Sequence, residues 1–120
     1  MDRPTSAVTP ITIKQAIEAS DGGALTGFYT DDAVLTIIDR NNPPSRPRRM
    51  HGREAIGSFW QDVCSRQMTH HVHSSVAEGD HLTFTEDCAY PDGTKVVSMA
   101  ALDLKDGKIA RQTIVQAWDE

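Results

Sequence analysis

Three short segments, Glu78-Gly79-Asp80, Pro91-Asp92-Gly93 and Lys105-Asp106-Gly107, divide the second half of this 120-residue chain into stretches of similar length. Glycine beside aspartate is typical of tight turns between antiparallel strands, because glycine tolerates the backbone conformations that these turns require. The segments between the turns alternate apolar and polar residues, which predicts consecutive antiparallel strands. We expect these strands at residues 68–78, 81–90, 94–104 and 109–118.

The first half of the chain carries helical signals instead. Thr9 is suited to cap a helix that has Pro10 at its first position, and apolar residues recur at helical spacing as far as Ala19. A second short helix is expected through Phe28 and Tyr29, after the break at residues 20–23.

The β-branched run 33–38 predicts a strand, and residues 41–49 are a loop rich in proline and arginine. A third helix opens at Gly52 and buries an apolar face that includes Trp60. Helices followed by hairpin strands, without βαβ units, predict an α+β fold.

The composition and net charge of the chain exclude several classes of protein. With 38% hydrophobic residues the chain is an ordinary globular domain, and its net charge of −5 disfavours nucleic-acid binding. No apolar stretch approaches the ~18 residues of a membrane span, and the N-terminus lacks the features of a signal peptide, so we expect a cytoplasmic protein without a membrane partner. Residues 1–9 are expected to form a loose arm before a single domain at 10–120.

Specific motifs accompany this layout. They are Tyr29-Thr30-Asp31-Asp32-Ala33-Val34, then His51-Gly52-Arg53-Glu54-Ala55-Ile56 with Phe59-Trp60, and the hairpin Leu102-Asp103-Leu104-Lys105-Asp106-Gly107-Lys108-Ile109. On these motifs the chain resembles the nuclear-transport-factor-2-like superfamily, in particular its SnoaL-like polyketide cyclase and ketosteroid-isomerase branch. The resemblance covers about residues 10–118. It implies a cone-shaped, curved antiparallel sheet wrapped around a long helix, with two N-terminal helices, one apolar pocket and a homodimer.

Alternation along the strands indicates which side chains face inward. On 68–78 this face carries His70, Val72, Ser74 and Val76, and on 81–90 it carries Phe84, Glu86, Cys88 and Tyr90. His70 is thus expected beside Glu86, where a carboxylate can orient an imidazole as a general acid or base. A buried pair that only shapes the core is the alternative. We treat both cysteines, Cys64 and Cys88, as reduced thiols.

The resemblance also suggests a place for a general base. In ketosteroid isomerases an Asp near the end of the first strand takes this role, and the matching position here is Ile37. Asp39 lies two residues further, so it acts as a base only with a shift or bulge, and otherwise caps the loop that follows. The positions of the isomerase oxyanion donors fall near Ile13 and Ala100, which disfavours steroid isomerisation.

These observations predict a small pocket protein that needs no cofactor. If it is an enzyme, Asp39, His70 and Glu86 would transfer protons on a small hydrophobic carbonyl, polyketide-like or epoxide substrate. The substrate would be oriented by Tyr90, Ser98, Gln112 and Gln116 and would pack against Trp60 and Trp118, where the register of the last strand follows the family. The alternative is a non-catalytic ligand-binding or dimerisation module of the same fold.

The outward face of the sheet carries two further features, a pair of histidines and an apolar patch. His71 and His73 share an outward strand face, but spacing supplies no third ligand, so no metal site is expected there. The same outward face carries Val97, Met99, Ala101 and Val115. A monomer rarely exposes so large an apolar patch, which predicts a homodimer packed through the outer face of the sheet.

Overall fold

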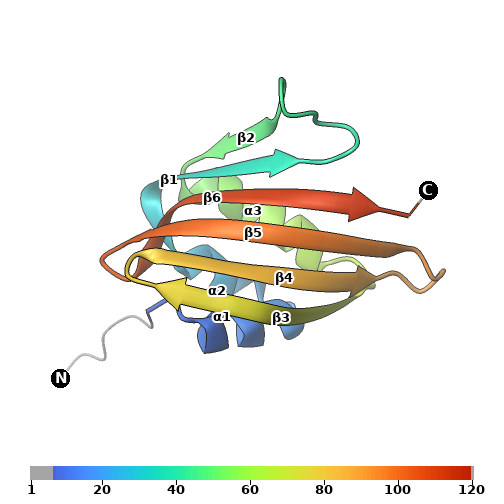
Figure 1. Ribbon diagram of the computed structural model, residues 1–120, viewed down its shortest axis with the longest axis horizontal. Helices are drawn as coiled ribbons and strands as arrows, with labels where there is room; N and C mark the ends of the chain where they lie inside the picture. Colours follow the sequence, from blue (N-terminus) through green and yellow to red (C-terminus); the bar gives the residue numbers. More distant parts are fainter. Residues whose placement is uncertain (1–6, 120) are drawn as a thin grey trace.

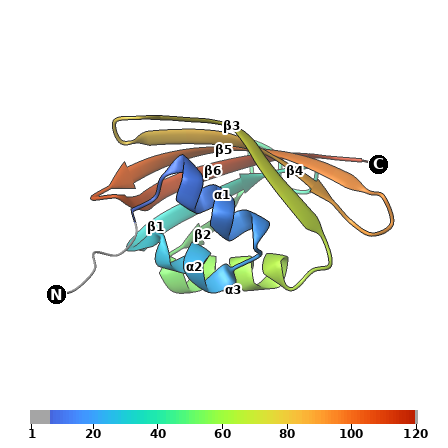
Figure 2. The same cartoon turned by 90° about the horizontal axis from the view of Figure 1, so that it is seen from below.

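A computed structural model describes residues 7–119, which form one curved, open sheet with helices packed on one face (Figures 1 and 2). The helices are α1 (Pro10–Glu18), α2 (Gly22–Gly27) and α3 (Arg53–Cys64). The strands are β1 (Tyr29–Ile38), β2 (Arg48–His51), β3 (Thr69–Glu78), β4 (His81–Ala89), β5 (Lys95–Lys105) and β6 (Lys108–Trp118). The predicted α+β fold, with a curved sheet around the longest helix, is confirmed.

The sheet has the order β2-β1-β6-β5-β4-β3, and its four C-terminal strands form the predicted hairpins. At the last turn, Asp106 and Gly107 both have positive φ (52° and 80°), as a two-residue hairpin turn of type I′ requires. One pair departs from the expected antiparallel pattern, since β1 runs parallel to β6. The last strand of the chain, β6, thus lies third in the sheet, between β1 and β5.

Two local predictions were wrong. The second helix ends at Gly27, and Tyr29 already belongs to β1, where it is buried and pairs with Ile109. The expected loop 41–49 ends in a short strand, β2, that pairs antiparallel with β1. Only Met50 of β2 is buried, so the sequence has no apolar alternation that would reveal the strand.

The N-terminal arm expected over residues 1–9 falls largely outside the described residues. Within them, Val8 is buried and its backbone N–H donates to the carbonyl of Gly107 at 2.9 Å. The packed domain therefore begins before Pro10. None of the helices within residues 7–119 is long and apolar enough to cross a membrane.

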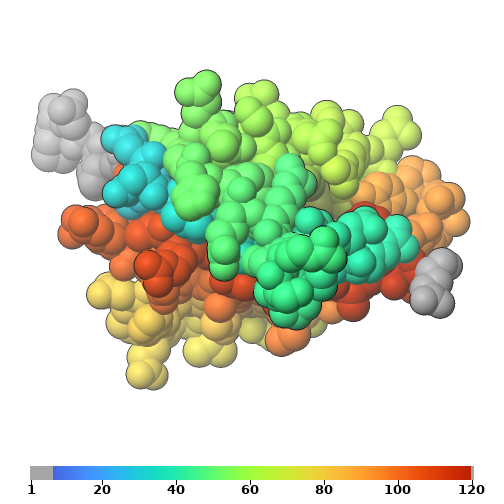
Figure 3. Space-filling model, turned by 90° about the horizontal axis from the view of Figure 1, so that it is seen from above, coloured from blue at the N-terminus to red at the C-terminus, as the bar shows by residue number. Residues whose placement is uncertain are grey.

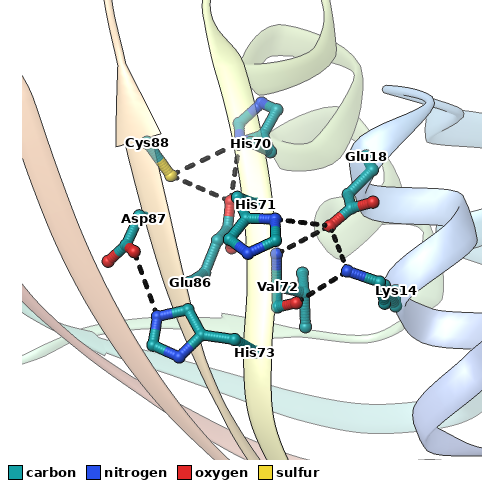
Figure 4. Close-up of polar contacts among 9 residues, drawn as sticks. All are labelled: Lys14, Glu18, His70, His71, Val72, His73, Glu86, Asp87 and Cys88. Atoms are coloured by element: carbon teal, nitrogen blue, oxygen red, sulfur yellow. Dashed lines mark hydrogen bonds and ion pairs between the residues drawn. The ribbon is translucent and has the colours of Figure 1, made fainter.

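Helix α1 protects an edge of the sheet. Thr9 caps the helix as predicted, because its hydroxyl accepts the backbone N–H of Thr12 at 3.1 Å. On the side toward β3, Lys14 Nζ donates to the carbonyl of Val72 at 2.8 Å, and Glu18 Oε2 accepts the N–H of Val72 at 2.9 Å (Figure 4). An edge strand presents unpaired backbone groups that invite pairing with other chains. Here Lys14 and Glu18, one turn apart on α1, provide hydrogen bonds to both the carbonyl and the N–H group of Val72.

A bulge in β3 corrects the predicted inward face. Ser74 has a φ of 55°, and the register with β4 shifts between His73 and Val76. The extra residue reverses the alternation beyond this point. Val76 is consequently 63% exposed on the outer side, and neither it nor Ser74 contributes to the core as expected.

Beneath the sheet, three side chains form a buried polar network. The hydroxyl of Tyr29 donates to Gln112 Oε1 at 2.5 Å and accepts the indole N–H of Trp60 at 3.0 Å. All three residues are buried, and burial raises the pKa of the Tyr29 hydroxyl, which therefore stays protonated. The network ties α3 to both β1 and β6.

The contact between α1 and β3 generates a pH-dependent prediction. The hydrogen bond from Lys14, then that from Val72, with a smaller contribution from His71, holds the pKa of Glu18 below its usual 4.5. A carboxylate with a lowered pKa stabilises the fold above that value and loses the effect as the pH falls through the folded pKa. Glu18→Gln should therefore lower the thermal unfolding midpoint at pH 7, and by less at pH 3. Glu78→Gln, at an exposed position without an ion pair in residues 7–119, is the control. An equal loss at both pH values would assign the effect to packing.

The buried network generates a second prediction. Tyr29→Phe leaves the indole N–H of Trp60 and the carboxamide of Gln112 without their shared partner. Unpaired buried polar groups should cost about 2 kcal/mol of unfolding free energy, measured by urea denaturation. The matched control is Tyr90→Phe. Tyr90 is half-buried, its hydroxyl bonds to Arg66 alone among residues 7–119, and its loss should cost less than about 0.5 kcal/mol. Equal costs for the two variants would refute the special role of the network.

Candidate functional site

A cavity of about 300 Å³ lies between α3 and the facing side of the sheet. Its surface is apolar and polar in nearly equal shares, and the apolar share includes Phe59, Trp60 and Val63 from the helix and Phe84, Val96 and Ile114 from the strands. Segment 39–51, which includes β2, crosses the molecule between α3 and strands β5 and β6 at this side (Figure 3). A cavity of this size and lining is typical of small-molecule sites.

The predicted pair of His70 and Glu86 is present at the cavity wall. His70 Nδ1 lies 2.6 Å from Glu86 Oε2, and the two side chains are only 4% and 9% exposed. The residue directly opposite His70 is Cys88, so Glu86 reaches the ring diagonally. Cys88 Sγ–H also donates to Glu86 Oε2 at 2.9 Å (Figure 4). The three side chains form one hydrogen-bonded cluster.

This contact constrains the tautomer of the imidazole. A carboxylate only accepts hydrogen bonds, so a neutral ring paired with it carries its proton on Nδ1 and its lone pair on Nε2. Nε2 makes no hydrogen bond within residues 7–119. Because no fully buried side-chain nitrogen or oxygen of the described residues lacks a partner, Nε2 is not fully buried. His70 lines the cavity, and an imidazole nitrogen with a free lone pair can take a proton from a bound molecule.

Cys88 serves this cluster as a hydrogen-bond donor. Burial, assisted by the negative charge of Glu86, raises the pKa of its thiol, which keeps the thiol protonated and weakly nucleophilic. The sequence places Cys88 on the inward face, yet its residue type alone suggests a core thiol. Its contact with Glu86 follows only from the register of β3 and β4.

His70, Glu86 and Cys88 also form the one group of potential metal ligands whose donor atoms converge within the described part of the chain. Their separations of 2.6 Å between nitrogen and oxygen and 2.9 Å between sulfur and oxygen are hydrogen-bond lengths. Two ligands on one tetrahedral zinc ion stand about 3.3 Å apart, so we assign the cluster to shared protons. On the outer face, His73 contacts Asp87 and His71 contacts Glu18, at 3.0 and 3.4 Å.

Asp39 lies at the cavity mouth, where it closes a turn. Its Oδ1 accepts the backbone N–H groups of Asn41 and Asn42 and the side-chain amide of Asn42, each at 2.9 Å. The strand stops at Ile38, and Ile37 occupies the wall position that the resemblance assigns to a base. The geometry thus matches the loop-capping alternative, although the carboxyl group still borders the cavity.

The structure gathers most of the other predicted residues around the cavity. The lining includes Trp60, Tyr90, Ser98, Gln116 and Trp118. Ser98 stands between Glu86 and Gln116 in one row across the sheet, since it pairs with both. Gln116 accepts the indole N–H of Trp118 at 3.1 Å, which leaves its amide N–H groups as donors. This row offers polar contacts beside the imidazole.

Gln112 is the predicted site residue that the structure places elsewhere. It does not line the cavity, because its side chain is 1% exposed and bonded to Tyr29. The prediction that Gln112 points inward is confirmed, but α3 covers this part of the sheet and separates Gln112 from the cavity. Conversely, Arg48 and Arg66 line the cavity. The basic cluster at residues 46–49 favours a solvated loop over its alternative, an anion or substrate clamp, and nothing in the sequence singles out Arg66.

Comparison with known families places this geometry in context. Residues 13–112 match the model of the SnoaL-like domain. This chain belongs to the SnoaL-like family. No curated protein matches its sequence.

Solved structures share the fold of this SnoaL-like domain. A protein of unknown function from Mesorhizobium loti, described as NTF2-like, is 18% identical with a TM-score of 0.74 over 88% of this chain and 84% of its own. A ketosteroid isomerase-like protein from Kribbella flavida is 17% identical with a TM-score of 0.74 over 92% and 74%. A polyketide cyclase-like protein from Sinorhizobium meliloti is 24% identical with a TM-score of 0.64 over 86% and 89%. At these identities the likeness establishes the fold alone.

Proposed function

We propose that this SnoaL-like domain binds one small, largely hydrophobic molecule in its cavity and transfers a proton of that molecule through His70. The observation that supports the proposal is the contact of 2.6 Å between His70 Nδ1 and Glu86, because it leaves Nε2 without a hydrogen-bond partner in residues 7–119 and not fully buried. A small carbonyl, polyketide-like or epoxide compound fits the apolar walls. The polyketide cyclase-like and ketosteroid isomerase-like proteins with this fold are consistent with such a substrate.

Glu86 has a defined part in this chemistry. It keeps the proton on Nδ1, so that Nε2 faces the substrate as a base, and it stabilises the imidazolium that forms after proton transfer. Its low exposure strengthens this interaction, because little water competes with it. Glu86 therefore acts as a positioning residue for His70.

The carbonyl of a substrate would be held by the row that follows Glu86 across the sheet. The Ser98 hydroxyl and the amide group of Gln116 both border the cavity. Donors fixed at such a place stabilise negative charge that develops on a carbonyl oxygen. Trp60, Tyr90 and Trp118 would enclose the apolar part of the molecule.

A non-catalytic ligand-binding module is the second candidate. It is favoured by Ile13 and Ala100, which occupy the positions near which the resemblance places the isomerase oxyanion donors and offer no side-chain hydrogen bond there. In that case His70 and Glu86 would serve as a polar anchor. Asp39 remains a second proton acceptor for the catalytic proposal.

Proton transfer can be tested without knowledge of the natural substrate. We expect the protein to exchange α-protons of a small cyclic ketone such as 2-tetralone for deuterium in D₂O, followed by NMR. Loss of the base in His70→Gln should slow this exchange by about 100-fold. His73→Gln is the matched control, because His73 makes a similar contact with Asp87 on the opposite face and should leave the rate unchanged.

Each outcome decides between the candidates. Binding of the ketone without any enhanced exchange would support the non-catalytic module. Exchange that survives in His70→Gln but is lost in Asp39→Asn would transfer the role of base to Asp39. Exchange lost equally in His70→Gln and His73→Gln would point to general destabilisation and contradict the proposal.

We also propose that the protein acts as a homodimer whose interface is the sheet face without helices. That face carries Met99, Val115 and Val97, which are 62%, 48% and 44% exposed. Met99 and Val115 are direct neighbours on β5 and β6, and Val97 pairs with Ala117 in the next row. A second copy of the same apolar surface would remove these side chains from water.

Light scattering coupled to size-exclusion chromatography tests this assembly. The wild-type protein should have about twice the chain mass of 13.2 kDa at micromolar concentration. Met99→Glu places a charge in the centre of the face and should yield monomers. Ile11→Glu, at a position 67% exposed on α1, should remain dimeric. A wild-type protein of 13.2 kDa would overturn the dimer.

A further inference from the structure

Three arginines are held by aromatic side chains around the cavity mouth. Arg48 Cζ lies 5.4 Å from the ring centre of Phe59, and Arg40 Cζ lies 5.1 Å from that of Trp118. Arg66 donates to the hydroxyl of Tyr90 at 3.1 Å. All three aromatic residues line the cavity, while the arginines come from β2 and from two connecting segments. In a chain with a net charge of −5, this concentration of cations at one mouth calls for a physical reason.

The three arginines differ in whether an acidic side chain neutralises their charge. Arg66 forms an ion pair with Asp62 at 2.6 Å. Neither Arg40 nor Arg48 pairs with an acidic side chain within residues 7–119. The carboxylate at the mouth, Asp39, already accepts three N–H groups. The mouth therefore retains guanidinium groups with unused donors.

From this geometry we infer that the molecule bound in the cavity is amphipathic, with an apolar body inside and a carboxylate at the mouth that Arg48 recognises. The inference rests on the proposed function, because it presumes that the cavity binds a ligand. A guanidinium binds a carboxylate through two parallel hydrogen bonds, and its stacking on Phe59 restricts its orientation beforehand. Arg48 lines the cavity directly and is therefore the principal contact.

Strand β2 supplies an internal comparison. Arg48 pairs with Ile37, which faces the cavity, whereas Arg49 pairs with Thr36 of the same strand. Because alternate residues of a strand point to opposite faces, Arg49 directs its charge away from the cavity. If both arginines only kept this edge strand soluble, they would be interchangeable in any binding experiment.

The experiment compares two probes of almost equal shape, 2-naphthoate and 2-naphthamide, by isothermal titration calorimetry. The wild-type protein should bind the carboxylate about tenfold more tightly than the amide, as charge-assisted hydrogen bonds predict. Arg48→Gln should abolish this preference, and Arg48→Lys should retain part of it. Arg49→Gln should preserve it in full, although it removes the same charge.

The outcomes separate this inference from the function on which it rests. Equal binding of the two probes to the wild-type protein would overturn the carboxylate preference and leave the pocket proposal standing. Failure of both probes to bind would count against the pocket proposal itself and overturn the inference with it. An equal loss of preference in Arg48→Gln and Arg49→Gln would reduce the effect to overall charge and remove Arg48 from the role.

Discussion

The candidate site depends on the burial of one carboxylate, that of Glu86. An isolated ionised group with 7% exposure would be strongly unfavourable, so its environment has to supply partners. His70 and Cys88 both direct a donor at Oε2, and both belong to strands whose register fixes them beside it. The need to satisfy a buried carboxylate thus dictates the geometry of the imidazole, which is the proton acceptor that we propose for the cavity.

The register of β3 is in turn secured from outside the sheet. This strand lies at an edge, and its Val72 is held on the free side by Lys14 and Glu18 of α1. Displacement of α1 would release the strand that carries His70. A short helix with no side chain in the cavity wall therefore contributes to the precision of the site. Two backbone hydrogen bonds of Val72 thus link the stability of the sheet edge to the geometry of the candidate site.

Helix α3 covers only part of the inner face of the sheet, so two sets of polar side chains beneath it differ in their surroundings. Where the helix packs closely, Tyr29, Trp60 and Gln112 satisfy one another and leave no group for a ligand. Where the helix stands off, Ser98 and Gln116 border the cavity with donors still available. The closed network fixes the position of α3, and the position of α3 sets the size of the cavity. On this face of the sheet, a ligand would meet polar side chains along the row of Glu86, Ser98 and Gln116.

The sequence by itself determined the hairpins, the inward face of most strands and the pairing of His70 with Glu86. These features follow from local rules, since turn residues and a period of two constrain each segment without reference to the rest. Tertiary structure alone decided the features that involve distant segments. The bulge at Ser74 turned Val76 outward, the closure of α3 withdrew Gln112 from the cavity, and the pairing of β2 with β1 brought Arg48 to its mouth. Register shifts and helix placement minimise the free energy of the whole packed core, so no local pattern of residues encodes them.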